Sequence, residues 1–273
     1  MLSEPIHLVY LSGGSDQPVV AHLRTLVVLG ALSQATVIES YAGEKSGYLA
    51  NAVTEIVAGD GAVLDHYKAQ LEDDNAFHVA ATEFHLGRDS NCSTNSVSIG
   101  GRLVRNDVTA VLSEGAHATL DGLYVVGGVQ HVDNHTSIEH AKPHGTSSEL
   151  YKGILDGRST AVFNGLVMVH PDAQKTDSKQ SNKNLVLSED ATINTKPELK
   201  IFADDVRCTH GATIGQLDAD AIFYLQSRGI ARGRARDLLT HAFATDITER
   251  IKVEPLRSSL EKRIWEKLDD VRA

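Results

Sequence analysis

Short segments in which hydrophobic and polar residues alternate recur along the first 215 positions of this 273-residue chain. Successive side chains of a strand point to opposite faces, so this alternation predicts β-strands that bury one face. Glycine-bearing turns separate many of the segments, and no long helical period with helix caps occurs before residue 218. The pattern predicts strands at residues 6–10, 25–29, 36–39, 54–57, 62–67, 78–84, 96–99, 108–112, 123–126, 160–169 and 185–187.

A loose internal repeat underlies these strands. The sequence VLSEGA at residues 111–116 is echoed by VLSEDA at residues 186–191. Gly-Ala pairs also open segments at Gly30, Gly61, Gly115 and Gly211. These gaps fit a repeating turn of roughly 20–30 residues with insertions, as in a β-solenoid. A β-sandwich is equally consistent with the hydrophobic pattern alone.

The period becomes helical after residue 217. Asp218 is suited to be a helix N-cap, and Gly229 is placed to end the first helix. A second helix is expected at about residues 231–251, and Pro255 suits the first turn of a third. The second helix should bury a stripe made of Ala235, Leu238, Leu239, Ala242, Phe243 and Ile247. Such stripes serve either to dock a partner or to pack on one another and on the β-domain.

Composition narrows the class of protein. The net charge of −10 disfavours a general nucleic-acid binder or an anionic-membrane partner, and two cysteines are too few for a disulfide scaffold. Neither a signal peptide nor an apolar run long enough to span a bilayer is present, which favours a cytoplasmic protein. The motifs G-x-x-x-x-G-K-[ST] and G-x-S-x-G are also absent, so we expect neither ATP hydrolysis nor the commonest serine-hydrolase chemistry.

The strongest candidate for chemistry is the pair Cys208 and His210. If Thr209 is extended, the thiol and the imidazole point to the same side of a strand and can share a soft metal. From spacing alone, a buried cysteine beside a surface histidine without any chemistry is the favoured interpretation, because C-x-H is a weak signal. The other cysteine, Cys92, lies in a turn-like sequence and is interpreted as an incidental thiol.

Two further polar segments need an interpretation. The run His131, His135, His140 and His144 includes Asp133, and in a strand the first two histidines and Asp133 would line one side. No catalytic metal motif accompanies the run, so surface groups beside a subunit interface are favoured over a metal site. Residues 171–184 carry no large apolar side chain, which predicts a solvated loop or a polar outer face packed against a partner.

Six segments, in one order, resemble the SufB/SufD family of scaffold subunits of the SUF iron–sulfur cluster assembly machinery, and its SufD members above all. They are QHVDNH at 130–135, ELYKGI at 149–154, QKTDSKQ at 174–180, NTKPEL at 194–199, FADDVRCTHGATIGQLD at 202–218 and FYLQSRG at 223–229. The resemblance implies a right-handed parallel β-helix at residues 1–215 and a helical domain at residues 216–273.

The resemblance also implies a function. In SufD-like proteins the cysteine and histidine that match Cys208 and His210 lie near the interface with SufB, where they help to build a nascent cluster. A transient iron–sulfur cluster is thus the implied cofactor, with ligation shared between subunits, and participation of a flavin is left open. The implied partners are SufB, or a second copy of the chain, and the ATPase SufC. We expect SufC to dock on the helices through Phe223, Leu239 and Phe243, and the protein to be a scaffold rather than an enzyme.

Two rival classes stay open on the residues alone. A β-helical carbohydrate-active enzyme of the lyase type would need clustered charges on one outer face, for which Asp133 and Glu139 are the hint. A purely architectural subunit would leave Cys208 and His210 idle. SufD-like proteins usually carry a helical region ahead of the β-helix, whereas this chain opens in a strand pattern. Roles of that region are therefore not transferred.

Overall fold

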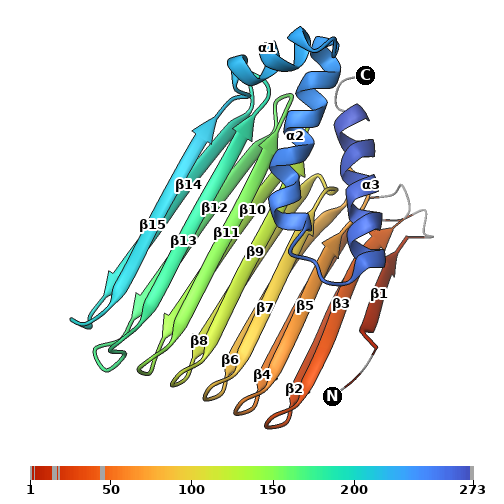
Figure 1. The fold of residues 1–273 in the computed structure, drawn as a ribbon. Helices are drawn as coiled ribbons and strands as arrows, with labels where there is room; N and C mark the ends of the chain where they lie inside the picture. Colours follow the sequence, from red (N-terminus) through yellow and green to blue (C-terminus); the bar gives the residue numbers. More distant parts are fainter. Residues whose placement is uncertain (1, 3, 14–16, 18, 44–46, 271–273) are drawn as a thin grey trace.

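The computed structural model describes residues 2, 4–13, 17, 19–43 and 47–270 as a parallel β-helix of about seven turns followed by three helices (Figure 1). Odd-numbered strands form one sheet in the order β1 (Ile6–Ser12), β3 (Gln34–Gly43), β5 (Val63–Gln70), β7 (Asn91–Ser98), β9 (His117–Val126), β11 (Thr146–Leu155), β13 (Asp177–Val186) and β15 (Arg207–Gly215). Even-numbered strands form the facing sheet, β2 (Val19–Leu29), β4 (Tyr48–Ala58), β6 (Phe77–Leu86), β8 (Leu103–Leu112), β10 (His131–His140), β12 (Thr160–Val169) and β14 (Thr192–Ile201). The parallel β-helix is the expected fold, and the sandwich alternative is wrong.

Each turn of the helix contributes one strand to each sheet, and each strand pairs in parallel with the strand one turn later. Asn91 lies beside His117, 26 positions later, and Thr160 lies beside Thr192, 32 positions later. The predicted repeat of roughly 20–30 residues is therefore close to the length of a turn. A sandwich would pair its strands antiparallel, whereas strand pairing within both sheets here is parallel.

The inside of the β-helix is part apolar and part polar. Leu64, Phe84, Leu120 and Phe163 belong to a buried apolar cluster between the two sheets. The inner faces also carry buried charged and amide side chains, including Glu39 at the N-terminal end of the helix. Buried polar groups need partners, and Glu39 lies 3.0 Å from the imidazole of His66 and accepts from Thr54 at 2.9 Å.

The polar segment at residues 171–184 is neither a loop throughout nor an outer face. Its second half belongs to β13, where Ser178, Gln180, Asn182 and Asn184 are buried inside the β-helix. Hydrogen bonds make this possible, because Asn182 donates to the carbonyl of Tyr151 at 3.2 Å and Asn184 donates to Asn182 at 2.6 Å. The prediction failed because a strand that buries polar side chains lacks the hydrophobic alternation by which strands are recognised.

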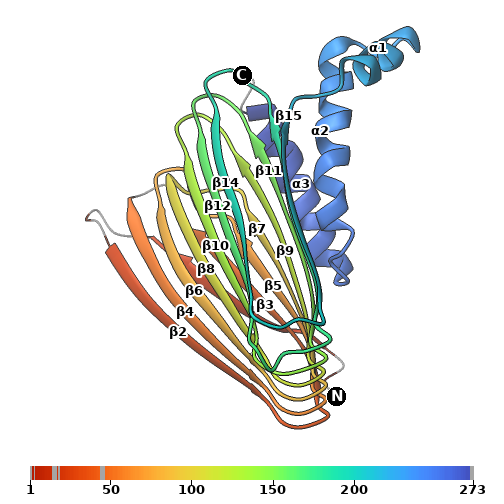
Figure 2. The same ribbon diagram turned by 90° about the vertical axis from the view of Figure 1, so that its left-hand side faces the viewer.

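Three helices follow the last strand: α1 (Ala219–Ser227), α2 (Arg232–Thr248) and α3 (Glu254–Asp270). Asp218 caps α1 as expected, accepting from the amide of Asp220 at 2.8 Å, and Gly229 has the positive φ that closes it. Figure 2 shows α2 and α3 against the outer face of the odd-numbered sheet, while no helix of the described residues covers the outer face of the even-numbered sheet. Within the described residues, no helix is long and apolar enough to cross a membrane.

The helices share an apolar core with the sheet that they cover. Ile247, Ile251, Leu260 and Ile264 pack in one cluster with outward-facing residues of the sheet such as Leu123. The stripe predicted for α2 is only partly right, since Ala235 and Ile247 are buried while Ala242 is exposed. Thr240, Ala244 and Thr248 are buried in addition, because the helix faces both the sheet and α3.

Candidate functional site

Cys208 and His210 lie on β15, the last strand of the odd-numbered sheet. In the parallel register Cys208 pairs with Ser178 and His210 with Gln180, and both partners are buried inside the β-helix. Paired residues of parallel strands point to the same face, so the thiol and the imidazole both belong to the inner face. The sequence expectation that they share one side of a strand agrees with this register.

The two side chains differ in exposure. Cys208 is half-buried and packs against the apolar cluster inside the β-helix, whereas His210 is exposed. Burial raises the pKa of the Cys208 thiol, and the carboxylate of Asp177 adds to this shift. A thiol of raised pKa is mostly protonated at neutral pH, so a metal cation or a base would have to displace its proton before sulfur becomes a ligand.

The position of β15 leaves the site open at one edge. β15 pairs with β13 on one side, and within the described part of the chain no strand pairs with its other edge. Ile214 on β15 and Phe202 after β14 are exposed at the same end of the β-helix. An unpaired strand edge with exposed apolar side chains is suited to pairing with another chain.

Cys208 and His210 do not belong to a larger group of metal ligands among the described residues. Within the ranges described, no group of three or more His, Cys, Asp or Glu side chains is arranged to bind a metal ion. Thiolate and imidazole are both good ligands for iron, and Cys208 with His210 would supply two of the usual four. The chemistry of these two donors is thus compatible with iron.

The second cysteine has a different environment. Cys92 lies on β7, not in a turn, and is buried in the apolar cluster between the sheets. Burial raises the pKa of its thiol to about 12. A buried thiol of such high pKa is inert, in agreement with its interpretation as an incidental cysteine.

The histidine run belongs to β10 and the turn after it. His131, Asp133 and His135 line the outer side of β10, as expected for a strand. Asp133 lies 2.9 Å from the His135 ring and also forms an ion pair with Arg105. His140 instead points inside, and burial lowers its pKa to about 4.

The two carboxylates that hinted at carbohydrate chemistry are both engaged. Asp133 pairs with Arg105 and His135, and Glu139 lies 2.6 Å from the ring of His170. Arg105 also binds Asp107, with N–O distances of 2.6 to 3.1 Å. Charges that neutralise one another in this way are typical of a solvated sheet face.

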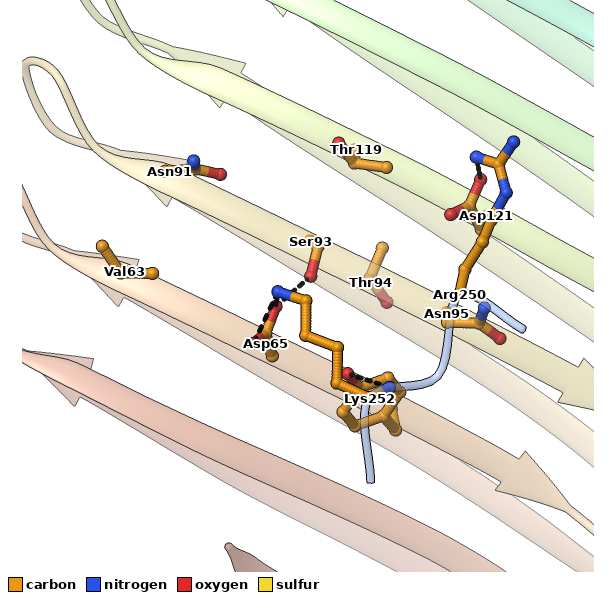
Figure 3. A pocket seen from close by; sticks show the side chains of 11 residues that line it. Val63, Asp65, Asn91, Ser93, Thr94, Asn95, Thr119, Asp121, Arg250 and Lys252 are labelled. Carbon is orange, nitrogen blue, oxygen red and sulfur yellow. Dashed lines mark hydrogen bonds and ion pairs between the residues drawn. The ribbon is translucent and has the colours of Figure 1, made fainter. Parts of the chain in front are cut away.

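A crevice of about 280 Å³ lies where the α2–α3 connection crosses the sheet (Figure 3). Figure 3 shows Lys252 reaching Asp65 and Arg250 reaching Asp121. The N–O distances of these ion pairs are 2.7 and 2.9 Å, respectively. Burial raises the pKa of Asp121 to about 6, although Arg250 opposes the shift. These four charges form two ion pairs between the α2–α3 connection and the sheet, and the ion pairs hold the helices against the sheet.

The three residues expected to bind a partner lie in unequal positions. Phe223 is 71% exposed on α1, and Tyr224 beside it is also exposed. Leu239 and Phe243 on α2 are half-buried. The ammonium group of Lys152 lies 3.8 Å from the centroid of the Phe243 ring, and Phe243 packs against the core between helices and sheet. Phe243 is thus already in use within the chain.

Sequence reasoning missed the polar pair beneath the site. Glu149 on β11 and Gln180 on β13 are buried and hydrogen-bonded at 2.7 Å. Both lie in segments that carry the family resemblance, at 149–154 and 174–180. The alternation of Ser178, Gln180, Asn182 and Asn184 at every second position was the available signal for an inward-facing polar strand.

The fold and the site together define a β-helical protein with a thiol and an imidazole at the open edge of its last turn and a helical pair fastened to one sheet. Residues 10–243 match the family model described as SUF system FeS cluster assembly, SufBD core domain. The chain belongs to this SufBD family.

Individual relatives agree with the family model. An iron–sulfur cluster assembly SufBD family protein of Synechocystis sp. is 39% identical over 269 residues, which cover 95% of this chain and 59% of the relative. The iron–sulfur cluster assembly protein SufD of Escherichia coli is 33% identical over 270 residues, covering 97% of this chain and 64% of that protein. SufD of Bacillus subtilis is 26% identical over 263 residues, covering 94% and 59%. The chain thus spans less than two thirds of the length of these relatives.

Proposed function

We propose that this chain is a non-enzymatic scaffold subunit on which the SUF system assembles iron–sulfur clusters, with Cys208 and His210 as ligands of the nascent cluster. The single observation that supports this role is the placement of both residues on the inner face of the last strand, whose outer edge pairs with no other strand of the described chain. Their paired neighbours are buried, whereas β15 itself is accessible at the end of the β-helix.

An incomplete ligand set suits a scaffold. Two ligands from this chain and others from a partner would hold a cluster only while the two chains are together, which allows release. The cluster is the cargo of this process. The residues of the chain would bind and orient its iron, and we assign no flavin site.

The partners follow from the open edge and the helices. SufB, or a second copy of the chain, would pair along the edge of β15, where Ile214 is exposed. SufC would dock on the helical module, with Phe223 of α1 as the most accessible of the three expected contacts. Family membership and the names of the relatives support the SUF context of both interactions.

The experiment that tests the ligand role compares cluster formation by the chain reconstituted with SufB and SufC. We expect His210→Ala and Cys208→Ala each to reduce the yield of cluster, measured by its visible absorption and its bound iron, by at least about tenfold. Both side chains lie at the last turn, so neither change should lower the melting temperature substantially.

Two variants serve as controls. Cys92→Ala removes the buried thiol, and His85→Ala removes an imidazole that is 57% exposed on the even-numbered sheet. Both should retain the cluster yield of the unmodified chain. Full cluster yield with His210→Ala and Cys208→Ala would leave the chain a purely architectural subunit.

A further inference from the structure

A glutamine lies directly beneath His210 inside the β-helix. Gln180 on β13 is the register partner of His210 on β15, and neighbouring strands are about 4.8 Å apart. Both side chains belong to the inner face, and Gln180 is 3% exposed. An imidazole and a carboxamide stacked at this spacing are within reach of a hydrogen bond. His210 is exposed, and its side chain forms no hydrogen bond with any other described residue.

The hydrogen bond between Gln180 and Glu149 determines which atom of the Gln180 amide remains without a partner. Gln180 Nε2 donates to Oε2 of Glu149 at 2.7 Å. At about pH 8.5, above the pKa of about 7 that burial gives Glu149, this carboxylate is ionised and can only accept. The amide nitrogen therefore faces Glu149, and the amide oxygen has to find a donor elsewhere. That oxygen, Gln180 Oε1, is buried and has no hydrogen-bond partner among the described residues.

The surrounding structure is built to hold this glutamine. A Cβ atom at Gly165 on β12 would lie 2.4 Å from Gln180 Nε2 and 2.8 Å from the Phe163 ring. Gly165 thus leaves the room across the β-helix that the carboxamide occupies. A buried acceptor without a donor costs roughly 1–3 kcal/mol. We therefore expect Gln180 Oε1 to accept a hydrogen bond that the isolated chain does not form.

A ligand imidazole needs such an acceptor. When one ring nitrogen of a histidine binds metal, the other normally carries a proton and donates it to a carboxylate, a carbonyl or a water. That hydrogen bond selects the tautomer and the ring orientation. His210 has no carboxylate as register partner on the strand below, but it has the unsatisfied amide oxygen of Gln180.

We propose that Gln180 is a positioning residue for His210, with its Oε1 accepting from one ring N–H so that the other ring nitrogen is left unprotonated for iron. Glu149 acts one step further away, because it holds the amide nitrogen of Gln180 and thereby aims the oxygen. This inference rests on the ligand role proposed above for His210.

The test measures the tautomer of His210 in the full-length chain without metal. Ring ¹⁵N shifts of histidine-labelled protein are recorded at about pH 8.5, above the usual titration range of imidazole. His210 is assigned from the signals lost in His210→Ala. We expect one dominant tautomer, with well-separated ring ¹⁵N shifts, in the unmodified chain. In Gln180→Met the two shifts should move toward their mean as both tautomers become populated.

Asn182→Leu is the matched control, because Asn182 is a buried amide on the same strand whose register partner is Ala212. It should leave the His210 shifts unchanged. Glu149→Gln is a second, isosteric control, and it should retain the single tautomer because an amide oxygen still accepts from Gln180.

Each outcome decides between the alternatives. Unchanged His210 shifts in Gln180→Met, or a mixture of tautomers already present in the unmodified chain, would overturn the positioning role. Cluster formation provides the second readout, and we expect Gln180→Met to reduce the yield severalfold, less than His210→Ala does. A normal yield with His210→Ala would refute the ligand role and leave the tautomer result standing.

Discussion

At the scale of single residues, the most unusual group near the site is the buried carboxyl of Glu149. Burial raises its pKa to about 7, and the neighbouring Thr136 and Gln180 reduce the shift without cancelling it. A carboxyl whose pKa is higher in the folded state than in the unfolded state binds its proton more tightly when folded. Its stabilising contribution is complete below the unfolded pKa, near 4.5, and is lost as the pH rises through 7.

We therefore predict that Glu149→Gln changes the pH dependence of stability. The glutamine does not ionise, so the free energy of unfolding of the variant relative to the unmodified chain should increase between pH 4.5 and 7. The increase should be roughly 1–3 kcal/mol, measured by urea unfolding across this range. A constant difference between the two proteins would mean that Glu149 keeps an ordinary pKa. Asp121, whose pKa is also raised, remains in both proteins, and only its electrostatic interaction with Glu149 differs between them.

Residue spacing predicted part of the site. The period of two in a strand places Cys208 and His210 on one face, and the register confirms that placement. Gln180 and Glu149 lie beneath that face, 30 and 61 positions before His210 in the sequence. They come close to it only because consecutive turns stack. Contacts between turns depend on the length of each turn, and a length that varies from 26 to 32 residues cannot be read from one sequence.

At the scale of elements, the three helices differ in how far they are buried against the β-helix. α1 has no buried residue, whereas α2 and α3 share a core with the odd-numbered sheet. Caps made α1 predictable, because Asp218 and Gly229 act locally. The buried side of α2 was harder to predict from the sequence, because contacts with the sheet and α3 bury Thr240 and Thr248 and leave Ala242 exposed.

We predict that Phe223→Asp weakens SufC binding by at least about tenfold without changing the melting temperature, because Phe223 is exposed and belongs to none of the buried apolar clusters of the described residues. Binding is measured by calorimetry with purified SufC. Phe243→Asp is the contrasting variant: it removes the contact with Lys152 and introduces a charge into a shared core, so the melting temperature should fall as well. Unchanged affinity with Phe223→Asp would place the SufC contact elsewhere on the chain.

At the scale of the whole molecule, the β-helix has two different ends. β14 and β15 are the last strands of the two sheets, and β1 and β2 are the first. Exposed apolar side chains occur at both ends, with Ile214 on β15 at 55% exposure and Leu26 on β2 at 63%. Only the end formed by β14 and β15 also carries Cys208 and His210.

This difference predicts which end associates with another subunit. Ile214→Lys should weaken pairing with SufB, or self-association, by at least about tenfold, because the ammonium group cannot be buried at low cost at an interface. Leu26→Lys at the opposite end is the matched control and should retain the affinity of the unmodified chain. Sedimentation velocity over a range of concentrations measures both. Equal effects of the two substitutions would argue against an interface at the β15 edge.

The β-helix itself was predictable to a limited extent. Alternation located strands wherever the inner face is apolar, as in residues 160–169, and repeated Gly-Ala turns indicated stacked turns. Strands such as β13 were not predicted, because their inner faces carry amides and hydroxyls instead of apolar side chains. The choice between solenoid and sandwich depended on parallel pairing between distant segments, for which the hydrophobic pattern contains no direct signal.

The period of two along β15 also constrains how sequences of this kind can change. Inserting or deleting a single residue between the turn before β15 and Cys208 would exchange the inward and outward positions of the strand. The sulfur and the imidazole would then face the solvent beside the sheet, although the composition of the chain would hardly differ. Length variation among homologues should therefore occur in the turns that connect strands, or in even steps within this strand, wherever the pair is retained.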